Sequence, residues 1–301
     1  MNDYRIRLKI VDIVIEIRSR FRMLPPEISH GRRDVHFIYN GKEKSEIILD
    51  VEMRNRLLKR DKGKRIFATF DPIKHRLRWR LFKKGDGYLI EQYTSGKRQF
   101  SVLNKNLNKG VVYISYKKNK RIWKLEDIVY DLLQIILISY LSKKDGLFVH
   151  SFGLRDIDGK GLLFVGQSKS GKSTSARIWH GNSDANIFSD DRIILKKIEQ
   201  EFFIFSSPWH GDFNAYVKHN EDRALLKKIF FIRHSPKNIA YRLNPKEAFE
   251  ALYPNIFPTF WDRDSMKKQI KLCHELVARK KAYKLGFKKD KSIISYIRSI
   301  G

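Results

Sequence analysis

Cysteine is almost absent from this sequence: Cys273 is the single one among 301 residues. One thiol can form neither an internal disulfide framework nor a cysteine-based metal site, so both are excluded. Scarce cysteine suits a reducing compartment, and we expect a cytoplasmic protein. Because Cys273 lies in a helical stretch, we expect it to belong to the core.

Long hydrophobic runs are missing as well. The longest, Ile135 to Ile138 with its neighbours, is closely flanked by polar residues and is too short to span a bilayer. The first residues, MNDYRIRLKI, lack the charged-then-apolar pattern of a signal peptide. We therefore expect neither a membrane span nor a secretion signal.

Acidic residues are scarce relative to basic ones: 33 Asp and Glu stand against 62 Lys and Arg, a net charge of +29. Such a balance favours acidic peptides, nucleic acid or anionic membranes as partners. The excess lies mainly outside residues 151–250. Two interpretations stay open: a lysine-rich solvated surface, or an N-terminal half that attracts an acidic partner. Nucleic acid is the less favoured alternative, and a homo-oligomer is left open.

Residues 1–120 have the alternation and turn residues of a β-rich domain. Strands are expected at 11–17, 35–39, 46–51, 77–82, 88–93, 98–103 and 111–116. Arg76, Arg78 and Arg80 alternate with apolar residues and share one strand face, either a solvated face or a grip for phosphates or carboxylates.

A second domain is expected at 121–301, beginning with a largely buried helix at 126–141. Strands alternate with helices in this part, which makes the fold class α/β. The later helices are expected at 245–252, 265–280 and 291–300.

The central motif runs from Gly166 to Ser173 and has the phosphate-loop (Walker A) pattern G-x-x-x-x-G-K-[ST]. Leu162 to Val165 before it reads as a buried parallel strand, and 172–180 after it as a helix closed by Gly181. Strand, glycine-rich turn and helix N-terminus suit a polyphosphate. The expected nucleotide-binding residues are Gly166, Gln167, Ser168, Lys169, Ser170, Gly171, Lys172, Ser173 and Thr174.

Ile187 to Ser189 is a short predicted strand that ends in Asp190 and Asp191. Ligands of open α/β sheets lie beyond the carboxyl ends of the strands, so this pair is expected beside the phosphate loop. One carboxylate can orient a metal ion or its waters while the other takes a proton from an incoming hydroxyl. The alternative is a solvated turn, and the sequence does not decide which of the two is the base.

This loop, the helix after it and the Ser-Asp-Asp segment resemble the catalytic domain of HPr kinase/phosphorylase and its relatives. That family shares its fold with ATP-dependent phosphoenolpyruvate carboxykinases. The resemblance covers about residues 145–295. It implies that Lys172 and Ser173 contact the phosphates and Mg²⁺, and that Asp191 accepts the proton of the substrate hydroxyl. It further implies that Asp190 lies beside the metal and that His150, in LFVHSFG, supports the acidic pair.

The chain departs from the family after Asp191. HPr kinases carry a downstream segment with glycine and arginine for substrate recognition and phosphorolysis, which has no counterpart here. Residues 207–212, SPWHGD, look more like HPr-kinase-like proteins found with peptide natural products, some of which phosphorylate a serine near the end of a precursor peptide. The resemblance therefore implies neither HPr as acceptor nor the reverse reaction. His210 and Asp212 are candidates for substrate or metal contacts, or form a turn with an aromatic anchor.

Three hypotheses follow. The first is a Mg²⁺-ATP-dependent kinase that moves a γ-phosphoryl group to a serine-like hydroxyl of a peptide or protein. The second is an enzyme of the same fold that acts on a small molecule. The third is a nucleotide sensor or nucleic-acid-associated protein that binds nucleotide without transfer. Neither the acceptor nor the role of the basic N-terminal half is fixed by the sequence.

Overall fold

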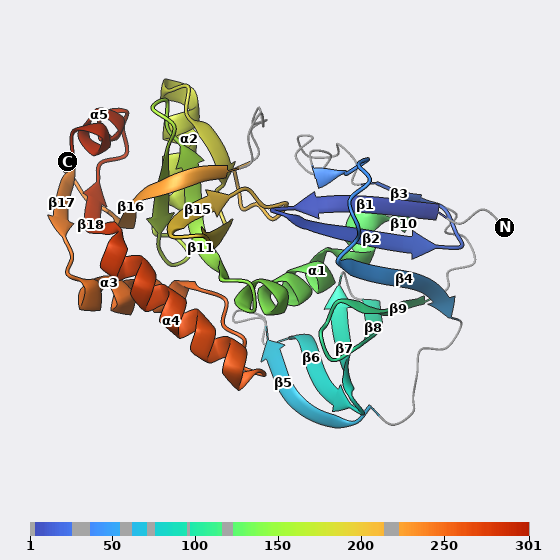
Figure 1. Cartoon of the computed structure of the whole chain (residues 1–301). Coiled ribbons are helices and arrows are strands. Elements are labelled where there is room, and N and C mark those ends of the chain that lie inside the picture. The colour runs from blue at the N-terminus through green and yellow to red at the C-terminus, as the bar shows by residue number, and fades with distance from the viewer. Residues whose placement is uncertain are drawn as a thin grey trace. The chain divides into compact units, whose positions relative to one another are not determined.

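The computed structural model of the chain describes residues 4–25, 37–54, 62–70, 76–94, 97–115, 123–213 and 223–300. Within these ranges five α-helices combine with two large sheets, so the protein is a mixed, sheet-rich α/β structure (Figure 1). The chain divides into two compact units, Met1–Tyr140 and Leu141–Gly301.

The predicted boundary between residues 120 and 121 lies outside the described residues, and the observed division falls near the end of α1 (Leu125–Ser142). Side chains of the first unit explain why most of this helix belongs there. Gln99 Nε2 donates a hydrogen bond to the Ile128 carbonyl, and the Tyr140 hydroxyl donates to Glu46.

The first unit is built on an eight-stranded sheet of order β1-β2-β4-β9-β8-β7-β6-β5. From β5 to β9 each strand pairs antiparallel with the next, whereas β4 is parallel to both β2 and β9. The strands are β1 (Tyr4–Ile10), β2 (Ile13–Ser19), β4 (Ile47–Arg54), β5 (Lys64–Phe70), β6 (Leu77–Lys84), β7 (Gly87–Thr94), β8 (Lys97–Leu103) and β9 (Lys109–Ser115). A short parallel pair, β3 (Met23–Leu24) and β10 (Trp123–Lys124), completes the unit.

One strand predicted in this unit begins later than expected, and another was wrong. The strand expected at 11–17 begins at Ile13, because Val11, with a φ of 61°, lies in the turn from β1. At 35–39 the first two residues lie outside the described ranges, and Ile38 makes only an isolated bridge to Leu8. The strands β1 and β5 were not predicted.

A buried carboxylate neutralises part of the predicted arginine face. Glu91 is fully buried, and Lys62, Arg80 and Arg98 approach its oxygens, Arg80 Nε at 3.1 Å. Burial raises the pKa of Glu91, but the hydrogen bonds and charges of Arg98 and Lys62 outweigh it and hold the pKa below its usual value. Arg80 therefore neutralises an internal charge.

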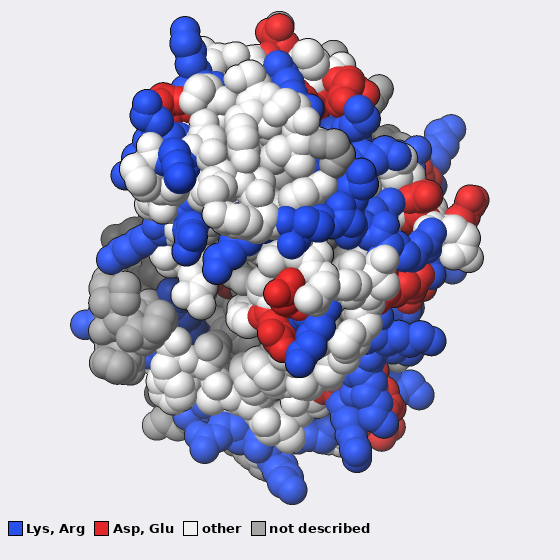
Figure 2. Space-filling view, turned by 90° about the vertical axis from the view of Figure 1, so that its left-hand side faces the viewer, with Lys and Arg blue, Asp and Glu red and all other residues white. Residues whose placement is uncertain are grey.

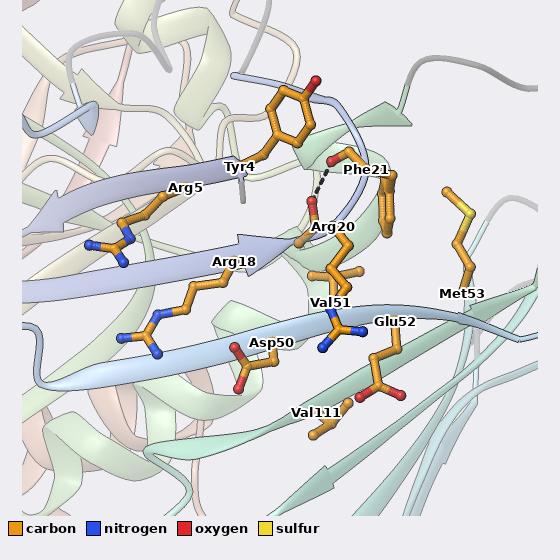
Figure 3. A pocket seen from close by; sticks show the side chains of 11 residues that line it. Tyr4, Arg5, Arg18, Arg20, Phe21, Asp50, Val51, Glu52, Met53 and Val111 are labelled. Carbon is orange, nitrogen blue, oxygen red and sulfur yellow. Dashed lines mark hydrogen bonds between the residues drawn. The ribbon is translucent and has the colours of Figure 1, made fainter. Parts of the chain in front are cut away.

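A cavity of about 690 Å³ lies in the first unit (Figure 3). Figure 3 shows Arg5 and Arg18 on the neighbouring strands β1 and β2, with Asp50 beside them on β4. The Nε atoms of these two arginines lie 3.1 and 2.6 Å from the carboxylate of Glu16. Arg20 and Glu52 also line the cavity, so its three arginines are accompanied by two carboxylates and the positive excess of the chain is not concentrated in it.

The pairings of the second unit close a ring of five strands: β11 (Gly146–Arg155), β12 (Lys160–Val165), β16 (Arg223–His234), β15 (Glu201–Phe205) and β14 (Arg192–Ile198), which returns to β11. β12 is parallel to β16 but antiparallel to β11, so the parallel strand predicted at 162–165 is parallel on one side only. β13 (Asn186–Ser189) pairs with β11, while β18 (Lys281–Phe287) and β17 (Ile239–Arg242) extend the sheet from β16.

Helices complete two apolar cores in this unit. One core includes α3 (Pro245–Leu252) and α4 (Arg263–Arg279), through Leu252 and Leu276. The other includes α2 (Lys172–Asn182) and α5 (Ser292–Ser299), through Trp179 and Ile297. The short 3₁₀ helix η2 (Tyr253–Asn255) follows α3. Cys273 lies in the first of these cores with 0% exposure, which confirms its prediction.

The end predicted for the helix after the phosphate loop was wrong. Helix α2 continues through Gly181 to Asn182, because side chains rather than glycine satisfy its last carbonyls. Asn182 Nδ2 donates to Ile178 O at 2.9 Å, and Ser183 Oγ donates to Trp179 O at 2.7 Å.

Lys and Arg side chains are spread over the face of the molecule in Figure 2, among fewer Asp and Glu. Over the part of the chain that the structure describes, no helix is long and apolar enough to cross a membrane.

Candidate functional site

The turn between β12 and α2 needs glycine at its last position. Gly171 has a φ of 104°, a conformation that residues with a side chain rarely adopt. A Cβ on Gly171 would lie 2.5 Å from the ring of Phe287 and 2.6 Å from that of His234. The turn is held by its own main chain, with Ser170 N donating to Gln167 O at 3.2 Å. It therefore leads directly into the N-terminus of α2, where main-chain N–H groups lack helical partners.

Lys172, the first residue of α2, folds back over this turn. Its Nζ donates to Gly166 O at 2.7 Å and to Gln167 O at 3.0 Å, and the residue is only 6% exposed. Burial lowers the pKa of Lys172 to about 8, although the carboxylate of Asp191 acts in the opposite direction. The ammonium is thus a largely desolvated charge at the phosphate loop, where an anion would stabilise it.

The other predicted loop residues lie at the surface of the turn or beside it. Gln167, Ser168 and Lys169 are exposed, while Gly166, Ser170, Ser173 and Thr174 are half-buried. Ser173 Oγ points at the acidic pair, because it donates to Asp190 Oδ2 at 2.7 Å.

Asp190 is a buried carboxylate, 1% exposed, and it accepts three hydrogen bonds. Besides Ser173 Oγ, Gly211 N donates to Oδ1 at 2.8 Å and Phe213 N donates to Oδ2 at 3.0 Å. A Cβ on Gly211 would lie 2.8 Å from Asp190 Oδ2, so this approach also requires glycine. Asp190 thereby joins α2, the end of β13 and the segment that follows β15.

Asp191 is more open, with a side chain that is 24% exposed, and both of its oxygens have cationic or potentially cationic partners. His150 Nε2 lies 2.9 Å from Oδ1, and Arg192 Nη1 lies 2.5 Å from Oδ2. Burial raises the pKa of Asp191, but the His150 hydrogen bond and the charges of Arg192 and Lys172 outweigh it and lower the pKa below its usual value. Asp191 is therefore ionised at neutral pH.

The main chain of the segment 206–213 contacts Asp190 and the end of β13. Ser189 Oγ donates to Trp209 O at 2.8 Å, which fixes the segment to the end of β13. His210 is half-buried, and Asp212 is exposed with its carbonyl accepting a hydrogen bond from Arg177 at 3.1 Å. The contacts to Asp190 come from the N–H groups of Gly211 and Phe213, on either side of Asp212.

The structure thus brings together His150, Lys172, Ser173 and both carboxylates of the acidic pair. Sequence reasoning missed Arg192, Gly211 and Phe213. Arg192 follows the acidic pair directly, and this adjacency was a usable signal. The other two act through main-chain N–H groups, and only at Gly211, where a Cβ would strike Asp190, does the contact also restrict the side chain.

A magnesium ion is expected here from the sequence. The oxygens present fit an ion that is held mainly by the phosphates of a bound substrate. Among the described residues no cluster of three or more His, Cys, Asp or Glu could enclose a metal. Magnesium usually keeps several waters and is held by one or two protein oxygens together with substrate phosphates. Ser173 Oγ and Asp190 Oδ2, 2.7 Å apart beside the loop, are oxygens of this kind.

Neither the family models nor the curated proteins include a match to this chain. Among solved structures, the Hpr(Ser) kinase/phosphatase from Coxiella burnetii aligns with 32% of this chain and 72% of its own, at 14% identity and a TM-score of 0.22. A likeness of this strength does not indicate the function of this chain.

Proposed function

We propose that this protein is a Mg²⁺-ATP-dependent kinase that transfers the γ-phosphoryl group to a serine-like hydroxyl of a peptide or protein. The observation that carries the proposal is the desolvated ammonium of Lys172, folded over a glycine turn at a helix N-terminus, next to two carboxylates in different environments. Few ligands other than a polyphosphate match a buried cation, the N–H groups of a helix N-terminus and a helix dipole at one place.

Lys172 would exchange its hydrogen bonds with the carbonyls of Gly166 and Gln167 for bonds to the phosphate oxygens of ATP. This exchange is favourable because a charge-assisted bond to phosphate is stronger than a bond to a neutral carbonyl. Ser173 and Asp190 would hold the magnesium ion or its waters. When bound, the ion supplies charge neutralisation at the β- and γ-phosphates.

Exposure distinguishes the roles of the two carboxylates. Asp190 is 1% exposed and its oxygens already accept three hydrogen bonds, which suits a residue that orients its surroundings. The side chain of Asp191 is 24% exposed and reachable from solvent. We therefore assign Asp191 as the proton acceptor, in agreement with the role that the sequence resemblance implies.

In the proposed reaction the acceptor hydroxyl oxygen bonds to the γ-phosphorus while the bond from phosphorus to the β–γ bridging oxygen breaks. ADP leaves, and the hydroxyl proton passes to Asp191. The lowered pKa of Asp191 makes it a weak base. A weak base is sufficient because phosphoryl transfer proceeds through a loose transition state, in which positioning and charge stabilisation supply most of the catalysis.

The acceptor is found by incubating the purified protein with γ-labelled ATP, Mg²⁺ and either a cell lysate or the peptides encoded beside its gene. The proposal predicts label on a serine of a peptide or protein, located by mass spectrometry, and no label with Asp191→Asn. Label recovered only in small molecules would contradict the peptide acceptor. ATP binding without any transfer would contradict the kinase.

A further inference from the structure

Arg192 contacts Asp191 in two ways. Its Nη1 lies 2.5 Å from the carboxylate Oδ2 and also donates to the Asp191 carbonyl at 3.2 Å. The opposite carboxylate oxygen, Oδ1, faces His150 Nε2 at 2.9 Å. The carboxylate is therefore held from both sides, and rotation about its Cβ–Cγ bond would break both contacts.

The guanidinium of Arg192 is itself fixed by an aromatic ring. Its Cζ lies 4.5 Å from the ring centroid of Phe257, within the range of a favourable cation–π contact. Exposed ion pairs between long side chains contribute little to stability, because the side chains lose conformational entropy when they pair. Here the side chain is only 21% exposed and rests on a ring, so little freedom remains to be lost.

Phe257 in turn belongs to a loop that is tied down at several points. Phe257 N donates to Phe148 O at 3.0 Å, and Ile256 bridges Val149, both on β11. The buried amide of Gln269 on α4 donates to the Phe257 carbonyl at 3.1 Å. The ring over Arg192 is thus anchored to the strand that carries His150.

The backbone of Arg192 is fixed in the same way. Its N–H donates to Ser189 Oγ at 3.2 Å, and its carbonyl accepts from Ser207 Oγ at 2.6 Å. His150 and Arg192 are direct partners in the β11–β14 ladder, so their side chains emerge on the same face of the sheet. One ladder position therefore supplies both groups that hold Asp191.

We propose that Arg192, seated on Phe257, is a positioning residue that keeps the Asp191 carboxylate in one orientation toward the acceptor hydroxyl. The inference rests on the proposed kinase function, and it assigns to these two residues a role beyond fold stability. Removing a mere surface ion pair would leave the rate of phosphoryl transfer unchanged. Removing a contact that positions Asp191 would lower that rate.

The test compares Arg192→Met, Arg192→Lys and Phe257→Leu with wild type. Arg242→Met is the matched control, because Arg242 also lies over an aromatic ring, that of Tyr283, 5.3 Å from its centroid. For each variant, Mg²⁺-ATP affinity is measured by calorimetry and kcat by transfer of γ-label to the acceptor. We expect Arg192→Met to lower kcat about 10–100-fold with ATP affinity nearly unchanged, since misplacing a reacting group by about 1 Å has an effect of this order. The kcat values of Arg192→Lys and Phe257→Leu should lie between those of Arg192→Met and wild type, and the kcat of Arg242→Met should equal that of wild type.

Chemical rescue separates positioning from a general loss of structure. Added ethylguanidinium should restore part of the kcat of Arg192→Ala and leave Asp191→Asn inactive. The inference is overturned if Arg192→Met transfers label at the wild-type rate. It is also overturned if Arg192→Lys folds normally but has a kcat no higher than that of Arg192→Met, and if ethylguanidinium restores none of the kcat of Arg192→Ala. If wild type itself moves no label, the proposed function fails; crystal structures of wild type and Arg192→Met then still report whether the Asp191 carboxylate turns.

Discussion

Loss of charge should destabilise the protein far more at Asp190 than at the neighbouring Asp191. In Asp190→Asn only one oxygen remains for the donors Ser173 Oγ–H, Gly211 N–H and Phe213 N–H, and the new amide faces at least one N–H group in a buried place. A hydrogen bond to a charged group contributes about 1.5–3 kcal/mol, and a buried unsatisfied donor costs about 1–3 kcal/mol. We therefore expect Asp190→Asn to lower the free energy of unfolding of the second unit by about 2–4 kcal/mol.

Asp191→Asn should cost much less, about 1 kcal/mol, because that side chain is partly exposed and its main partners keep access to water. The assay is thermal unfolding followed by tryptophan fluorescence, to which Trp179, Trp209 and Trp261 of the second unit contribute. For a unit of this size about 1 kcal/mol corresponds to roughly 2–4 °C, so Asp190→Asn should melt about 4–16 °C lower. Asp184→Asn, an exposed change in the same unit, is the control and should stay within about 0.5 kcal/mol of wild type. Equal melting of the Asp190 and Asp191 variants would refute the division of roles.

Three further predictions concern glycine geometry, buried charge and the thiol. Gly171→Ala should lose Mg²⁺-ATP binding and melt below Gly159→Ala, because both positions have positive φ but only a Cβ at Gly171 would strike the ring of Phe287; equal melting of the two would count against this reasoning. Glu91→Gln should lower the free energy of unfolding by about 1–3 kcal/mol at pH 7. Because folding lowers the pKa of Glu91, wild type is more stable than Glu91→Gln above the usual pKa of 4.5, and this difference in the free energy of unfolding is lost as the pH falls through the folded-state pKa. Urea titrations that give the same difference in stability from pH 7 to pH 3 would contradict this prediction. Burial raises the pKa of Cys273 to about 12, so a thiol reagent should label it only after unfolding, and rapid labelling of the native chain would show that this core is open.

The sequence predicted the local features of the site better than its assembly. The glycines around Lys172 follow a fixed spacing because the turn needs them, and Lys172 and the Ser-Asp-Asp segment carry their chemistry in side chains, which is why both features could be recognised in the sequence. His150 was placed by resemblance, and the structure sets its Nε2 2.9 Å from Asp191. Helix α3 was predicted at its observed bounds, since Asn244 and Glu247 form a capping box at its start.

Contacts through main-chain groups or between distant segments could not be predicted. The N–H group of Phe213 that holds Asp190 has no side-chain signature, and the need for glycine at position 211 follows only from the approach of Asp190 in the folded chain. The contact of Arg192 with Phe257 depends on how the loop after η2 returns to β11. The ring of five strands depends on a parallel β12–β16 pairing between segments far apart in the chain, and apolar periodicity shows only that each strand is buried.

The most direct test of the central claim measures binding and transfer separately on three proteins: wild type, Lys172→Ala and Asp191→Asn. Mg²⁺-ATP affinity is determined by calorimetry, and transfer by the appearance of γ-label on a serine of the acceptor. The account predicts that Lys172→Ala loses both activities and that Asp191→Asn binds ATP nearly as wild type does but transfers no label. Transfer by Asp191→Asn at the wild-type rate would contradict the assignment of the base, and unchanged ATP affinity in Lys172→Ala would contradict the phosphate site.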